Sequence, residues 1–121
     1  MAELRRPPSI DAYGGGGFRV SGQRVEGSIL ILGDVLGPWP VAALTDVTPE
    51  SLSQVIAAGS REVEFLLLGV GARIAPPPPA VRLALQAAGL GLEVMDTMAA
   101  SRVYNVLAAE GRRLAAAIIA I

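Results

Sequence analysis

The sequence predicts an α/β fold, a three-layer sandwich with a mixed, mostly parallel central sheet, an N-terminal β-hairpin and about three helices. Short apolar runs of strand length alternate with segments of helical spacing through the second half of the chain. That order typically gives parallel strands joined by helices that cover the sheet. A glycine-turn hairpin ahead of them makes the sheet mixed. With 121 residues, the chain is long enough for one domain.

The N-terminal region divides into an arm and a hairpin. Residues 1–16 mix prolines, isolated charges and most of a glycine run, so we expect a flexible arm that buries little apolar area. The single α/β domain then covers residues 17–121. Its hairpin pairs Phe18–Val20 with Gln23–Leu32, and Gly22 supplies the turn.

The elements after the hairpin have recognisable ends. Thr48 is a good N-cap for the first helix, Pro49 suits its first position, and Gly59 ends it. Trp39 stands between two prolines, and we expect its ring to close over the core. The later elements are strand Glu62–Leu68, helix Ala80–Ala88, strand Leu92–Met95, helix Met98–Glu110 and strand Arg113–Ile119. The stripes expected to be buried on the two later helices are Val81, Leu83 and Leu85, and Val103, Val106 and Leu107.

Composition favours binding over catalysis. All 10 basic residues are arginines and the chain has neither cysteine nor histidine, which excludes thiolate and imidazole chemistry and ordinary zinc sites. We therefore predict no catalytic residue, no metal and no cofactor. The formal charge of -1 is scattered along the chain, which disfavours nucleic acid as a partner.

Two segments bear on location. Met1–Ser9 reaches two prolines instead of an apolar stretch, so it lacks the pattern of a signal peptide. The longest apolar run, Leu114–Ile121, is far shorter than the roughly 20 residues that a membrane-spanning helix needs. We therefore expect a cytoplasmic protein without an integral membrane segment.

Two other segments are expected to meet at one edge of the sheet. Gly69–Arg73 follows a predicted buried strand, and Asp96–Thr97 follows the neighbouring strand. Parallel strands bring their carboxyl ends to the same edge, where open α/β sheets bind ligands. One interpretation is a pocket for a small anionic ligand, with Arg73 as the charge partner and the glycine amides and the Thr97 hydroxyl as donors. The other is structural, with a glycine turn and a helix cap.

The last predicted helix carries a polar edge. Ser101, Arg102 and Asn105 lie at neighbouring helical positions beside Tyr104. This edge is either solvated or part of a partner surface, because Arg and Tyr are enriched at such surfaces. The candidate ligand-binding or partner-binding residues are therefore Gly69, Gly71, Arg73, Asp96, Thr97, Ser101, Arg102, Tyr104 and Asn105.

Several segments form a series along the chain: Gly17–Gly22, Thr48–Leu52, Leu67–Arg73, Glu93–Thr97, Arg102, Tyr104–Leu107 and Glu110–Arg113. In residues and order they resemble a family of small prokaryotic proteins of unknown function that also includes a mitochondrial assembly factor for respiratory complex I. The resemblance implies a three-layer α/β fold and a role in assembling or escorting other proteins. Met98, Ser101 and Val103 stand where members more often carry glycine, cysteine and threonine, which argues against a thiol-dependent role.

Two functions therefore stay open. The first is a non-catalytic protein-interaction or assembly-factor domain, a monomer or weak dimer, with a respiratory-complex subunit or a component of another membrane complex as its partner. The second is a small anionic-ligand-binding domain, or an uncharacterised enzyme, that uses the pocket at the Gly69–Arg73 and Asp96–Thr97 sheet edge.

Overall fold

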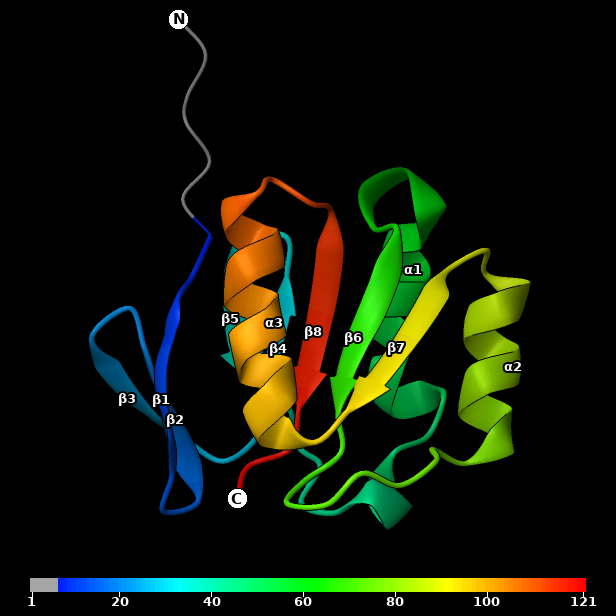
Figure 1. Cartoon of the computed structure of the whole chain (residues 1–121). Coiled ribbons are helices and arrows are strands. Elements are labelled where there is room, and N and C mark those ends of the chain that lie inside the picture. Colours follow the sequence, from blue (N-terminus) through cyan, green and yellow to red (C-terminus); the bar gives the residue numbers. More distant parts are fainter. Residues whose placement is uncertain (1–6) are drawn as a thin grey trace, which may run out of the picture.

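The computed structural model describes residues 7–121, which form two β-sheets and three α-helices (Figure 1). One sheet has the strand order β1-β2-β3, and the other has the order β5-β4-β8-β6-β7. The strands are β1 (Ile10–Gly14), β2 (Gly17–Val20), β3 (Gln23–Glu26), β4 (Ile29–Leu32), β5 (Val35–Pro38), β6 (Phe65–Gly69), β7 (Gly91–Met95) and β8 (Leu114–Ile118). The helices are α1 (Ser53–Glu62), α2 (Pro79–Ala87) and α3 (Thr97–Ala109), with short 3-10 helices at Leu44–Asp46 and Glu50–Leu52.

The five-stranded sheet is mixed because its two halves pair differently. Strand β4 runs antiparallel to both β5 and β8, whereas β6 runs parallel to both β8 and β7. The central strand β8 is buried along its whole length, and its neighbour β6 is buried at all but its first residue. Strands covered on both faces need an unbroken run of apolar residues, and both sequences supply one.

The two faces of this sheet pack into two different cores. Leu66 and Leu68 of β6 join Val55 of α1 and Val81 of α2 on one face. Leu67 joins side chains of α3 and of the three-stranded sheet on the other. In Figure 1, α1 lies behind the sheet and α3 lies in front of it. The predicted mixed α/β sandwich with three helices and an N-terminal hairpin is confirmed. Within residues 7–121, none of the helices is long and apolar enough to cross a bilayer.

The first helix starts at the predicted place but in two steps. Thr48 and Ser51 exchange hydrogen bonds, with Ser51 N donating to Thr48 Oγ1 at 3.1 Å and Thr48 N donating to Ser51 Oγ at 2.9 Å. A 3-10 turn follows, and α1 then continues past Gly59, whose φ is 71°, to Glu62. Trp39 is buried as expected, and its Nε1 donates to Ser51 O at 2.8 Å.

Part of the predicted arm is a strand, which corrects the sequence analysis. Strand β1 pairs antiparallel with β2, and the buried Ile10 anchors it in the core beneath α3. The Asn105 side chain of α3 accepts from Ile10 N at 2.9 Å and donates to Ile10 O at 2.8 Å. The composition of residues 10–14 does not predict this strand, because the side chain that holds it, Asn105, lies 95 residues further along the chain. Residues 1–6 of the predicted arm lie outside the described residues.

The predicted strand Gln23–Leu32 is in fact two strands in two sheets. Gly27 has a φ of 80°, which ends β3 before the chain enters β4. The hairpin turn itself is confirmed, because Ser21 and Gly22 have φ values of 48° and 83°. Positive φ at both central residues matches the twist of the flanking strands.

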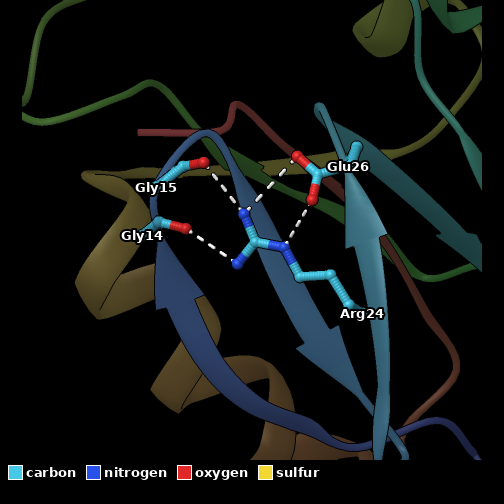
Figure 2. A network of polar contacts seen from close by, with 4 residues as sticks. All are labelled: Gly14, Gly15, Arg24 and Glu26. Atoms are coloured by element: carbon cyan, nitrogen blue, oxygen red, sulfur yellow. Dashed lines mark hydrogen bonds and ion pairs between the residues drawn. The ribbon is translucent and has the colours of Figure 1, made fainter.

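Arg24 holds the glycine turn between β1 and β2 against β3 (Figure 2). Its guanidinium donates to Gly14 O at 3.0 Å and to Gly15 O at 2.9 Å, and its Nε donates to Glu26 Oε1 at 2.7 Å. The hydrogen bond from Arg24, reinforced by its charge, holds the pKa of the Glu26 carboxyl below its ordinary value. A lowered folded-state pKa stabilises the fold above the unfolded-state pKa, and this contribution is lost as the pH falls through the folded-state pKa.

We expect Arg24→Gln to raise the pKa of Glu26 toward its ordinary value, because the charged donor is removed. A side-chain NMR titration of Glu26 measures the change. Any stability difference between the two proteins should be present at neutral pH and disappear in acid. Arg82→Gln on α2 is the matched control, since Arg82 is exposed and has no contact with Glu26. Equal Glu26 titration in Arg24→Gln and the unmodified protein contradicts this account.

Candidate functional site

The structure brings the predicted sheet-edge residues together, but it uses their polar groups internally. The buried Thr97 hydroxyl accepts from Gly71 N at 3.1 Å and donates to Ile119 O at 2.6 Å. Thr97 N in turn donates to Gly71 O at 2.8 Å. The Thr97 side chain therefore connects the segments that follow β6 and β8, and its hydroxyl group already donates one hydrogen bond and accepts another within the protein.

The charged residues at this edge have different roles. The Asp96 carboxylate caps α3, because its Oδ1 accepts from Ala99 N at 2.8 Å. Arg73 is exposed in the loop after β6. The helix-cap interpretation of Asp96 thus agrees with the structure. Because the Gly71 amide and the Thr97 hydroxyl are both engaged, the two donors that an anionic-ligand pocket here would need are not available.

Gly69 has a packing role at the same edge. A β-carbon placed on it would lie 2.8 Å from Ile118 Cγ2 and 3.1 Å from Ala100 Cβ. Real β-carbons essentially never approach another heavy atom as closely as the first of these distances. Glycine at this position therefore lets α3 lie close to the sheet.

The predicted polar edge of α3 is mostly not at the surface. Ser101 is buried and its Oγ donates to Thr97 O at 2.8 Å, and Tyr104 is buried at 1% exposure. Asn105 is half-buried and holds Ile10 of β1. Only Arg102 is exposed to solvent. Of the edge expected to be either solvated or part of a partner surface, Ser101 and Tyr104 are therefore inside the domain.

The surface carries instead an apolar groove beside α3 that the sequence analysis did not anticipate. Its volume is about 310 Å³. We call it the α3–β7 groove, and its lining residues are Phe65, Leu67, Glu93, Met95, Val103, Leu107 and Arg112. The floor comes from β6 and β7 and one wall comes from α3, and no helix lies in front of β7 in Figure 1.

The two charged residues of the groove differ in their surroundings. Arg112 Nη2 lies 3.2 Å from Glu64 Oε2, and its guanidinium lies 5.5 Å from the centroid of the Phe65 ring. Glu93 is exposed, and no ion pair engages it within the described residues. The groove therefore carries a carboxylate, Glu93, that no ion pair of residues 7–121 engages, and a guanidinium, Arg112, that shares Glu64 with Arg113.

The groove was missed because the buried face of α3 was assigned to the wrong residues. The core side of the helix is small and partly polar, with Thr97, Ala100, Ser101 and Tyr104 buried. The predicted stripe is partly outside: Val103 and Leu107 are half-buried in the groove wall, and Val106 is 57% exposed. Because the core side carries a threonine, a serine and a tyrosine, the apolar spacing alone pointed to the wrong side of the helix.

A similar correction applies to α2. Val81 and Leu85 are buried as expected, but Leu83 is 64% exposed. Leu83 lies two residues from each of them, so it points away from the face that they share.

The fold and this surface define a small mixed α/β domain whose open feature is an apolar groove rather than a cluster of free polar groups. Residues 10–119 match the family described as "Protein of unknown function (DUF498/DUF598)". The chain belongs to this family, as the sequence resemblance indicated.

Relatives and solved structures agree with this assignment. An uncharacterized protein of Rhodobacter capsulatus is 38% identical over 110 residues, which cover 91% of this chain and 82% of that protein. NADH dehydrogenase [ubiquinone] 1 alpha subcomplex assembly factor 3 of Bos taurus is 36% identical over 110 residues, but the match spans only 59% of its length. A crystal structure of a Bartonella henselae protein, described as an outer membrane protein, superposes with a TM-score of 0.88 at 33% identity and covers 98% of both chains.

We expect Thr97→Val to lower the free energy of unfolding by about 3 kcal/mol, because Gly71 N–H and Ile119 C=O lose a partner in a buried place. Urea unfolding measures the change. Thr45→Val is the matched control, since Thr45 is exposed and no hydrogen bond engages its hydroxyl among residues 7–121; its effect should stay within about 0.5 kcal/mol. Equal stabilities for the two variants would rule out the junction role of Thr97.

We expect Gly69→Ala to lower the free energy of unfolding by about 1 to 3 kcal/mol, because the new methyl group meets Ile118 and Ala100. Gly37→Ala on the edge strand β5 is the control, since a β-carbon there has no neighbour within 4 Å. Thermal and urea unfolding of both variants test the packing role. If Gly69→Ala leaves the free energy of unfolding unchanged, the packing of α3 does not depend on a close approach at this position.

Proposed function

We propose that this protein is a non-catalytic, cytoplasmic protein-binding domain that assists the assembly of a respiratory complex or another membrane complex. The observation that carries the proposal is the open apolar α3–β7 groove on a domain of this family. Exposed apolar grooves of this kind commonly bind other proteins.

The relatives support the same role. Assembly factor 3 proteins from several vertebrates share 32% to 36% of their residues with this chain. Because the chain spans only 59% to 64% of their lengths, the domain shared with them is the part to which the proposed role applies. The protein would act as a monomer or weak dimer and hold a subunit before it joins its complex.

The competing ligand-binding role has less support. The amide and hydroxyl that would hold an anion at the Gly71 and Thr97 edge hydrogen-bond within the protein. Arg73 alone remains free to attract an anion there, and a single exposed arginine gives weak binding.

We expect the tagged full chain, purified from its own cells with a moderate salt wash, to retain subunits of a respiratory or other membrane complex. Deleting the gene should lower the amount of the assembled complex on native gels, and the unmodified chain should restore it. Thermal unfolding of the purified protein with nucleotides and organic anions tests the competing ligand-binding role, and we expect no change in the melting temperature. A true ligand present at 100 times its dissociation constant would raise the free energy of unfolding by about 2.7 kcal/mol. A protein without partners, with normal complex levels in the deletion strain, contradicts the assembly role.

A further inference from the structure

We propose that the α3–β7 groove receives one amphipathic α-helix of the partner protein, which lies beside α3 and presents a lysine or arginine to Glu93. This inference rests on the proposed function and specifies how the partner is held. It follows from the layer structure of the domain, from the outer side of α3 and from the charge of Glu93.

The layer on the α3 side of the sheet is incomplete. Two helices, α1 and α2, cover the opposite face. On the α3 side, the three-stranded sheet and α3 contribute the side chains that cover β4, β8 and part of β6, while Phe65, Glu93 and Met95 of β6 and β7 line an open groove. Helix α3 packs on β6 and β8 and also touches β7. The open strip therefore lies over the edge strand β7, beside the outer side of α3.

The outer side of α3 has the composition of an internal helix surface. Val103 and Leu107 form the groove wall, and Val106 next to them is 57% exposed. These residues are spaced three and four apart, which is the spacing that packs against a neighbouring helix. A second helix parallel or antiparallel to α3 would cover both this wall and the floor residues Leu67 and Met95.

The charge of the groove selects the chemistry of the helix. Covering Glu93 with an apolar surface would remove its carboxylate from water, which is unfavourable unless a cation pairs with it. Arg112 and Arg113 share Glu64, and Arg112 also lies over the Phe65 ring, but no ion pair joins either arginine to Glu93 within the described residues. The docked helix must therefore bring its own lysine or arginine.

A photo-crosslinking experiment in cells tests this arrangement. The full chain carries the crosslinking residue p-benzoylphenylalanine in place of Leu107 in the groove wall, or in place of Leu83 on α2 as a control. We expect the Leu107 position, and not the Leu83 position, to crosslink to one partner segment. Peptide mapping should show that this segment has apolar residues at helical spacing and a lysine or arginine beside the crosslink.

Charge reversal makes the test specific. Glu93→Lys should lower the yield of crosslinked product at least about tenfold, because a like charge then faces the partner's cation. Glu62→Lys, an exposed carboxylate at the end of α1, should leave the yield unchanged. Replacing the mapped lysine or arginine of the partner by glutamate should restore crosslinking to Glu93→Lys. Melting curves of both variants should match the unmodified protein, since Glu93 and Glu62 make no ion pair within the described part of the chain.

Three results would overturn the proposal: no crosslink from the Leu107 position, a crosslink to a second copy of this chain, or a mapped segment that is extended or acidic. Unchanged crosslinking in Glu93→Lys would also overturn it. The assembly function is tested separately from the groove. If the tagged chain still retains complex subunits, the assembly function is supported even when the groove proposal fails. If complex levels are normal in the deletion strain, the assembly function itself is wrong.

Discussion

The fold depends on the junction made by one buried hydroxyl group. Thr97 lies directly after β7 and at the start of α3, and its side chain reaches Gly71 after β6 and Ile119 after β8. Three strands of the five-stranded sheet therefore end at one hydrogen-bonded point. Since Asp96 caps α3 at the same place, the junction also sets where that helix starts and how it crosses the sheet.

Small residues then determine how close α3 comes to the sheet. Gly69, Ala100 and Ala116 of β8 lie where the helix and the strands meet. Tyr104 is buried under this close approach, whereas Val103 and Leu107 pack against the edge of the same core and also form the groove wall. The packing that stabilises the domain thus leaves an apolar surface beside it. The core and the candidate binding surface are two sides of one helix.

Local signals in the sequence were sufficient for elements whose ends are encoded nearby. The Ser21-Gly22 turn, the Thr48 start of the first helix and the Asp96 cap could all be predicted, because the residues that fix them are within a few positions. Strand β1 could not, since Asn105 and β2 supply what its own composition lacks. The break at Gly27 was also hidden, because a glycine in a strand-like run does not show that its two sides belong to different sheets.

The site was harder to predict than the fold. Gly71 and Thr97 were correctly expected to meet, but whether neighbouring polar groups bind a ligand or each other depends on distances that the sequence does not contain. For α3, the buried side carries Thr97, Ser101 and Tyr104, so the apolar spacing did not mark it, and its position depends on the close approach to Gly69 in the sheet below.

The Asn105 clamp on Ile10 also sets an order of events during protein synthesis. The strand that it holds is made 95 residues before the side chain that holds it. At a translation rate of about 5 to 20 residues per second, β1 waits roughly 5 to 20 s for its anchor. During that interval β1 can already pair with β2, but Ile10 lacks the core that later covers it. The N-terminal sheet is therefore fixed against the rest of the domain only after α3 has been made.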